Sequence, residues 1–183
     1  MKKKRYVVGV TGASGVIYAQ RLLEVLCTQA SVDLVISDIA REIAGYEGVS
    51  LEGFDAVYHG NGEMGADIAS GSCQHDGMVI IPCTVKDLAA IAHGLSDTLI
   101  TRAADVSLKE RRGCILVLRE MPLSRVHLRN MLAADEAGAT VMVASPGFYH
   151  RPETVLDLVD MVVARVLDHL GEPHSLATRW KGF

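Results

Sequence analysis

The stretch from Thr11 to Gly15 consists of small and hydroxylated residues, which suit the binding of a phosphate group. It follows the short apolar run Tyr6 to Val10 and precedes Val16 to Cys27, whose apolar residues recur at helical spacing. A turn between a strand and a helix exposes backbone N–H groups at the helix start, and the helix dipole favours negative charge there. We therefore expect a nucleotide or flavin phosphate at this turn, with the Ser14 hydroxyl as an added donor.

An alternative stays open, because the turn matches no specific phosphate motif. Its glycines follow neither the dinucleotide pattern G-x-G-x-x-G nor the P-loop pattern that ends in Gly-Lys-Ser/Thr. A tight turn that joins a strand to a helix in any α/β domain could have the same residues. From the turn alone, phosphate binding and a purely structural role are both consistent with the sequence.

Polar side chains also follow the other predicted strands. In a parallel sheet ligands bind above the carboxyl ends of the strands, so these positions are candidates for a site. The pair Arg119-Glu120 directly follows an apolar strand, where the guanidinium can hold a phosphate or a flavin carbonyl and the carboxylate can pass a proton. A chance pair of loop residues is the alternative interpretation. The further candidates at strand ends are Ser37, Cys83 to Lys86, and Ser145 to Tyr149.

Arg102 and Lys109 are seven residues apart on a predicted helix and lie on the same face of it. Asp105 stands between them, at the spacing of neighbours on a helix surface. An exposed, ion-paired stripe explains this spacing and is favoured over a shared grip on an anion. Taken alone, Tyr149 is typical of a loop aromatic, and Arg165 is typical of a polar position on an amphipathic helix.

The histidines and cysteines form no catalytic or metal-binding pattern. None of the seven histidines pairs with a serine or cysteine as in a triad. The four cysteines contain no C-x-x-C and no zinc spacing. We therefore expect no metal, and we interpret the cysteines as reduced thiols of a cytoplasmic protein. Glu47 ends a predicted helix and is expected to be exposed to solvent.

Six predicted strands alternate with six predicted helices, and these elements must position the polar side chains. The alternation predicts an α/β fold, a three-layer Rossmann-like (flavodoxin-like) domain with a mainly parallel sheet covered on both faces. Ser96 or Asp97 is expected to cap the fourth helix. The predicted strands are Tyr6 to Val10, Val32 to Ser37, Ala56 to His59, Gly77 to Pro82, Cys114 to Leu118 and Thr140 to Ala144. The predicted helices are Val16 to Cys27, Ile39 to Tyr46, Val85 to His93, Thr98 to Arg111, Ser124 to Ala137 and Glu153 to Leu170.

The composition is consistent with one domain that spans residues 1–183. Of the 183 residues 49% are apolar, and roughly 100–200 residues are typical of a single domain. The formal charge is −4 and basic residues form no long run, so nothing favours a nucleic acid as partner. No apolar run approaches the roughly 18 residues of a membrane span. We interpret the basic start, Met1 to Arg5, as a solvated tail rather than part of a signal peptide.

Several motifs in one consistent order carry a resemblance that covers nearly the whole chain. The run from Thr101 to Arg112 is the most specific of these motifs. The other motifs are Thr11-Gly12-Ala13-Ser14-Gly15, Pro82-Cys83-Thr84-Val85-Lys86, Leu118-Arg119-Glu120, Pro146-Gly147-Phe148-Tyr149-His150 and Arg179-Trp180. With these motifs the chain resembles the UbiX-type flavin prenyltransferases, within the wider group of flavin-binding, cysteine-decarboxylase-like folds.

The resemblance implies an enzyme that binds FMN and alkylates it. Members of this family transfer a dimethylallyl group from dimethylallyl monophosphate to N5 and C6 of reduced FMN, without a metal. Their product, prenylated FMN, is the cofactor of a UbiD-type decarboxylase. They form dodecamers built from trimers, with sites at the subunit interfaces. The resemblance therefore implies a homo-oligomer, with no nucleic acid and no membrane as partner.

The resemblance also implies roles for individual residues. Glu47 is implied as a catalytic acid and base near the flavin, with Ser14 and Glu120 assisting it. The residues implied to hold FMN are Gly12, Ala13, Ser14, Ser37, Thr84, Val85, Lys86, Asp87 and Arg119. The residues implied to grip the prenyl phosphate are Arg102, Lys109, Arg119, Tyr149 and Arg165.

The chain departs from the family pattern at two places. Asp87 stands where the family often has a hydroxylated or small residue, and an acid near the FMN phosphate would weaken phosphate binding or face away from it. Some members place a tryptophan over the flavin where this chain has Glu63 or Met64.

Two alternative functions are weighed against the transferase. The first alternative is a flavin-dependent decarboxylase of the same fold. Sequences of those enzymes show a pattern similar to His-Ile-x-Leu before the central strand and Pro-Ala-Ser-Ala-Asn after it, and this chain has neither motif. The second alternative is a non-catalytic FMN-binding subunit, which would keep the residues that bind the flavin and lose those that bind the prenyl phosphate. Lys109, Tyr149 and Arg165 are all present, which argues against that alternative.

Overall fold

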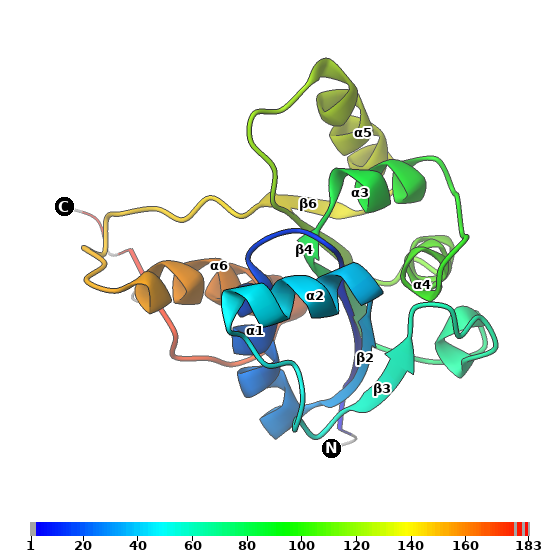
Figure 1. The fold of residues 1–183 in the computed structure, drawn as a ribbon, viewed down its shortest axis with the longest axis horizontal. Helices are drawn as coiled ribbons and strands as arrows, with labels where there is room; N and C mark the ends of the chain where they lie inside the picture. The colour runs from blue at the N-terminus through cyan, green and yellow to red at the C-terminus, as the bar shows by residue number, and fades with distance from the viewer. Residues whose placement is uncertain (1–2, 178, 181, 183) are drawn as a thin grey trace.

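Six parallel strands form one sheet in the order β3-β2-β1-β4-β5-β6 (Figure 1). The structure, a computed structural model, describes residues 3–177, 179, 180 and 182, so Met1 and Lys2 of the predicted tail lie outside the described residues. The chain winds outward in one direction from β1 to β3 and in the other from β4 to β6, which creates a switch point between β1 and β4. The strands are β1 (Arg5–Val10), β2 (Ser31–Ile36), β3 (Val57–Gly60), β4 (Gly77–Cys83), β5 (Cys114–Leu118) and β6 (Thr140–Val143).

Helices cover both faces of the sheet, as the alternating sequence predicts. The first, second and last helices share one apolar core, and the three helices between them share the other. Figure 1 shows α1, α2 and α6 grouped apart from α3, α4 and α5. The helices are α1 (Val16–Gln29), α2 (Asp38–Glu47), α3 (Val85–Ala92), α4 (Leu99–Lys109), α5 (Arg125–Glu136) and α6 (Val155–Leu170), with a short 3-10 helix, η1 (Asp67–Ala69).

The central strands are mostly apolar because their two faces enter different cores. In β1, Tyr6 and Val8 pack with α1 and α6, whereas Val7 packs in the core on the opposite face. All residues of β4 are buried, while those of the edge strand β6 are only partly buried or exposed. Continuous apolar runs are typical of parallel strands covered on both sides. The predicted α/β class with a parallel sheet is confirmed.

The starts of two helices differ from the sequence prediction, and capping explains both. Thr98 caps α4, because its hydroxyl accepts the backbone N–H of Thr101 while the Thr101 hydroxyl accepts the N–H of Thr98. The predicted caps Ser96 and Asp97 are therefore wrong. Thr154 caps α6 in the same reciprocal way, so that helix begins at Val155 and not at Glu153.

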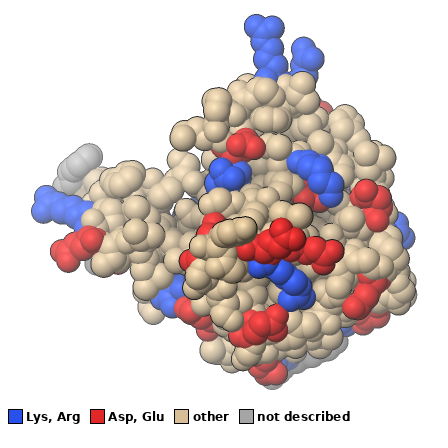
Figure 2. Space-filling model, viewed as in Figure 1, with Lys and Arg blue, Asp and Glu red and all other residues tan. Residues whose placement is uncertain are grey.

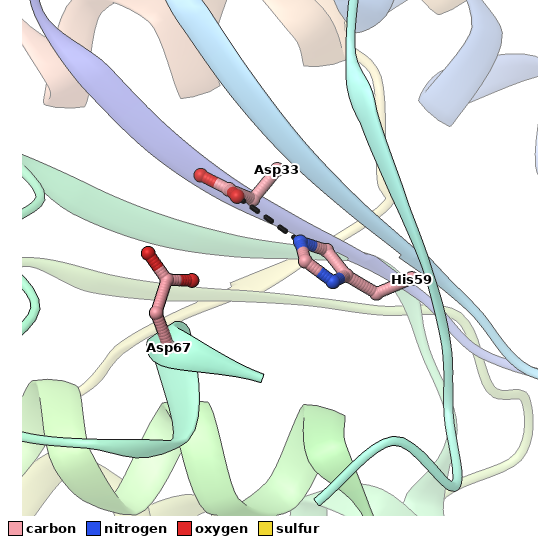
Figure 3. Close-up of side chains that lie close together, drawn as sticks. All are labelled: Asp33, His59 and Asp67. Atoms are coloured by element: carbon pink, nitrogen blue, oxygen red, sulfur yellow. Dashed lines mark hydrogen bonds and ion pairs between the residues drawn. The ribbon is translucent and has the colours of Figure 1, made fainter. Parts of the chain in front are cut away.

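A network of charged side chains attaches the weakly patterned segment after α2 to the sheet. The Arg5 guanidinium at the start of β1 donates to both carboxylate oxygens of Asp33 at 2.6 and 2.9 Å, and to Asp67 of η1 at 3.0 Å. His59 of β3 lies 3.1 Å from the same Asp33 carboxylate (Figure 3). One guanidinium thereby links β1, β2 and η1, and the imidazole adds the edge strand β3.

The cluster of Asp33, His59 and Asp67 has ligand types that suit a metal, and its ligand atoms lie within 4.8 Å of one another. Arg5 already supplies a positive charge to both carboxylates, so a divalent cation would have to displace it. Partial burial alone raises the pKa of Asp67, but the hydrogen bond and charge of Arg5 outweigh it and hold that pKa below its usual value. We interpret this cluster as structural.

We expect Arg5→Ala to lower the free energy of unfolding by about 3 kcal/mol, because it leaves the Asp33 carboxylate buried without its cation. The Asp33 side chain is only 2% exposed. Arg41→Ala is the control, since Arg41 pairs with Glu52 on the surface and its loss should cost less than about 1 kcal/mol. Urea unfolding followed by circular dichroism measures both. Equal stability of the two variants would contradict this role of Arg5.

Candidate functional site

A cavity of about 520 Å³ opens at the carboxyl edge of the sheet, beside the switch point. It lies between the starts of α2 and α3, and the ends of β1, β2, β4 and β5 lead into it. This is where ligands bind in open parallel sheets. The lining residues are Gly12, Ala13, Ser37, Asp38, Ile39, Asn61, Thr84, Val85, Lys86, Asp87, Arg119 and Glu120.

The N-terminus of α1 does not face this cavity with free donors, which differs from the expectation for the turn after β1. The Glu47 carboxylate, from the last residue of α2, accepts the backbone N–H of Gly15 at 2.7 Å and that of Val16 at 2.8 Å. These are the amides at which we expected a phosphate. A carboxylate and a phosphate satisfy such donors in the same way. Ser14 is exposed and does not line the cavity.

The starts of α2 and α3 form two walls of the cavity instead. Ser37 and Thr84 cap these helices, because their hydroxyls accept the N–H of Ala40 and Asp87 respectively. The caps leave the other first-turn amides of each helix without partners inside the helix. The Thr11 hydroxyl links the end of β1 to β4 and the start of α3: it donates to the Pro82 carbonyl at 2.9 Å and accepts the Thr84 N–H at 2.9 Å.

Arg119 brings an unsatisfied donor to the cavity. Its backbone N–H bonds to the Cys83 carbonyl, which fixes the end of β5 beside the end of β4. Its side-chain Nε is buried and has no hydrogen-bond partner within the described residues. A buried unpaired donor in a cavity wall is costly unless a ligand or water accepts from it. The Cys83 thiol is a poor nucleophile here, since burial raises its pKa well above the usual value.

The sequence predicted most of this wall and missed three lining residues. Every residue assigned to FMN except Ser14 lines the cavity, and so does Glu120. Asp38 and Ile39 were missed because the sequence argument stopped at the strand end, Ser37. Asn61 was missed because its glycine-rich segment carries little periodicity. Its side chain and carbonyl accept the N–H groups of Ile100 and Leu99, which anchors the start of α4 at the cavity.

Two of the residues assigned to the prenyl phosphate lie along α4 and do not line the cavity. Arg102 pairs with Asp105 at 2.9 Å and donates to the Ala69 carbonyl, which confirms the predicted ion pair on this helix face. Lys109 instead pairs with Glu110 at 2.5 Å, at the last turn of the helix. An α-helix rises 1.5 Å per residue, so Lys109 lies about 15 Å along the axis from the helix start at the cavity.

Tyr149 and Arg165 lie at a second cavity, of about 490 Å³. The chain leaves β6 and crosses in an extended segment to α6, as Figure 1 shows. Tyr149 belongs to this segment by its number and lines the second cavity, not the first. Asp168 accepts from Arg165 at 2.8 Å and from Arg179 at 2.7 Å. Partial burial raises the pKa of Asp168, but the bonds from Arg179 and His174 outweigh it and lower that pKa overall. Within one chain the predicted phosphate residues thus fall into three separate groups.

The charge distribution is mixed. Figure 2 shows acidic and basic side chains interspersed across one face of the molecule, without a continuous basic area on that face. None of the helices that the structure describes is long and apolar enough to cross a membrane.

Comparison with known proteins gives concordant matches. The family model "Flavoprotein" matches residues 1–167. The flavin prenyltransferase UbiX of Methanocaldococcus jannaschii is 46% identical over 180 residues, which cover 96% of this chain and 98% of that protein.

Two solved structures resemble this one closely along the whole chain. A crystal structure of a UbiX protein in complex with FMN and dimethylallyl pyrophosphate has a TM-score of 0.95 at 39% identity and covers 100% of both chains. A dodecameric protein of Escherichia coli O157:H7, described as an FMN-dependent UbiX-like decarboxylase, has a TM-score of 0.92 at 44% identity. It covers 97% of this chain and 100% of that one.

We expect Gly12→Ala to lower the free energy of unfolding by about 1–3 kcal/mol, because the cavity wall has no room for a side chain there. A Cβ atom on Gly12 would lie 2.6 Å from Ile39 Cγ2. The double variant that combines Gly12→Ala with Ile39→Ala should recover part of the lost free energy of unfolding. Gly45→Ala in α2 is the control: its Cβ meets nothing within 4 Å, so it should stabilise the helix by about 0.5–1 kcal/mol. Chemical denaturation of Gly12→Ala, Ile39→Ala, the double variant and Gly45→Ala measures this, and strict additivity of the double variant would contradict the steric explanation.

Proposed function

Since this chain belongs to the family of UbiX flavin prenyltransferases, we propose that it transfers a dimethylallyl group from dimethylallyl monophosphate to N5 and C6 of reduced FMN. One observation carries the proposal: the solved UbiX structure that holds FMN and dimethylallyl pyrophosphate matches this chain over its full length. The donor that we propose has one phosphate fewer than the ligand of that structure. A monophosphate leaving group carries less charge than a diphosphate, so cationic side chains suffice without a metal ion.

The cavity at the carboxyl edge of the sheet, which is the main cavity for the proposed function, has features that suit FMN. Its volume of about 520 Å³ lies within the range of roughly 300–1,000 Å³ that is usual for cofactor sites. The guanidinium of Arg119, whose Nε is unpaired, lines this cavity and can donate to a flavin carbonyl or a phosphate oxygen. We propose that FMN lies against the lining residues Gly12, Ala13, Ser37, Thr84, Val85, Lys86, Asp87 and Arg119, with Ser14 next to them in the turn after β1.

The proposed role of the basic residues follows from the chemistry of the donor. Bound reduced FMN would supply the nucleophile of the reaction. Breaking the C–O bond of an allylic phosphate leaves negative charge on the departing phosphate. Lys109, Arg119 and Arg165 are the cations proposed to stabilise that charge, together with the Tyr149 hydroxyl, and Arg102 would lie near them.

These residues can meet only if copies of the chain assemble. Arg102 and Lys109 lie on α4, and Tyr149 and Arg165 lie at the second cavity, so one chain leaves the main cavity without most of the phosphate grip. We propose that neighbouring subunits complete each site, in an assembly like the dodecamer of the Escherichia coli relative. The assembly would place Arg165 or Lys109 of one copy beside the flavin of another.

The partner enzyme and the location are proposed from the same family membership. The product would be the cofactor of a UbiD-type decarboxylase, and both proteins would act in the cytoplasm. Residues 1–183 would form a single FMN-binding domain, because both apolar cores are built from elements spread along the whole chain.

Mass spectrometry of the flavin tests the proposed reaction. The purified protein is incubated without oxygen with reduced FMN and either dimethylallyl monophosphate or the diphosphate. We expect a flavin heavier by one prenyl unit with the monophosphate. Turnover of the diphosphate alone would contradict the proposed donor. FMN that stays bound but unchanged with both would favour the alternatives, a decarboxylase or a non-catalytic FMN-binding subunit.

We expect Glu47→Gln to lower turnover by about a hundredfold or more while the Kd for FMN stays the same, because an amide keeps the shape but cannot exchange a proton. The Gln oxygen can still accept one of the two backbone bonds that Glu47 accepts from Gly15 and Val16. Glu42→Gln, an exposed position on the same helix, is the control and should retain full activity. Normal prenylation by Glu47→Gln would remove Glu47 from the mechanism.

We expect Lys109→Ala and Arg165→Ala to raise the KM for the prenyl donor by about tenfold or more, because each removes a charge-assisted hydrogen bond to its phosphate. The Kd for FMN should change much less. Steady-state kinetics and flavin fluorescence quenching measure the two quantities, with Arg41→Ala as a surface control. Equal loss of both ligands would indicate misfolding or lost assembly, and not a phosphate grip.

A further inference from the structure

Asp87 is a buried acid in the wall where the proposed function needs a phosphate to bind. The residue is 5% exposed and lines the main cavity in the first turn of α3. The sequence left two possibilities for this side chain: it weakens phosphate binding or it faces away. It does not face away, because its carboxylate accepts hydrogen bonds from the side chains of Thr84 and Lys86, which line the same cavity.

The carboxylate of Asp87 occupies the groups that α3 could offer to a phosphate. Its Oδ2 accepts the Thr84 hydroxyl at 2.5 Å, and its Oδ1 accepts the Lys86 ammonium at 3.0 Å. The Thr84 oxygen also accepts the Asp87 backbone N–H at 3.0 Å, and the one proton of the hydroxyl is already donated to Asp87. Lys86 is otherwise well placed for a ligand, because its side chain is 64% exposed.

The starts of α1 and α2, at the same edge of the sheet, do not replace the donors that Asp87 occupies at α3. At α1 the Glu47 carboxylate takes the amides of Gly15 and Val16. At α2 the first turn carries another acid, Asp38, which also lines the cavity. A phosphate bound near α3 therefore meets a fixed like charge, and the first-turn amides of α3 with Arg119 must attract it against that charge.

We propose that Asp87 sets how weakly this chain retains the flavin phosphate, by withholding the Thr84 hydroxyl and the Lys86 ammonium from it. The inference rests on the proposed function, since it concerns the same flavin site. It also gives that site a useful property. The product is a cofactor for a different protein and has to leave, and a phosphate held against a like charge dissociates faster.

Binding of two flavins that differ only by the phosphate tests this role. FMN and riboflavin are titrated, with fluorescence quenching as the readout, into the wild-type protein and into Asp87→Asn and Asp87→Ser. We expect both variants to lower the Kd for FMN by about tenfold, while the Kd for riboflavin changes less than about twofold. The dissociation rate of FMN should fall by a similar factor. Asp97→Asn removes the same charge outside the cavity and should change neither Kd.

The outcomes separate this inference from the proposed function. Weaker FMN binding by Asp87→Asn and Asp87→Ser would overturn the inference, because Asp87 would then help to organise the phosphate site. Parallel shifts for both flavins would also overturn it, since the side chain would then act on the pocket as a whole. In either case flavin binding itself, and with it the proposed function, would stand. Failure of the wild-type protein to bind either flavin would overturn both.

Discussion

The parallel sheet brings the starts of several helices to one edge, and every backbone N–H there needs an acceptor. The rest of the site depends on how this chain meets that demand. Glu47 supplies the acceptor for α1, and the hydroxyls of Ser37 and Thr84 cap α2 and α3. The gap between α2 and α3 stays open as the main cavity. The distribution of acids and hydroxyls over three helix starts thus decides where a phosphate can bind and how tightly.

Local rules of sequence were enough to predict the fold and much of the cavity. Strand ends in a parallel sheet share one edge, so the residues after β1, β2, β4 and β5 could be grouped from the sequence alone. Contacts between segments that are distant in the sequence could not be predicted in this way. Glu47 reaches Gly15 across 32 residues, and Arg5 reaches Asp67 across 62, and neither pairing leaves a periodic or motif signal. Resemblance to a family pointed to Glu47, but the amides that it binds became visible only in the structure.

The basic residues proposed to bind the prenyl phosphate do not meet within one chain, so under the proposed function one chain would be an incomplete enzyme. Lys109 ends α4 far from the cavity, and the extended segment after β6 carries Tyr149 to a different one. Lys109 is placed by the length of α4 and Tyr149 by the course of the segment after β6, so no small side-chain movement brings them to Arg119. Assembly of identical copies solves this without a new fold, because a symmetric contact can juxtapose two surfaces that are distant in one chain.

Mixed assemblies test this account most directly. Chains that carry Glu47→Gln are co-expressed with chains that carry Lys109→Ala, and turnover is compared with that of each variant alone. If neighbours complete each site, about a quarter of the sites in a random mixture combine an intact Glu47 with an intact Lys109, and activity returns to that extent. If mass photometry and native mass spectrometry show mixed assemblies that stay as inactive as their parents, the two residues do not serve a site shared between copies, and the account is wrong.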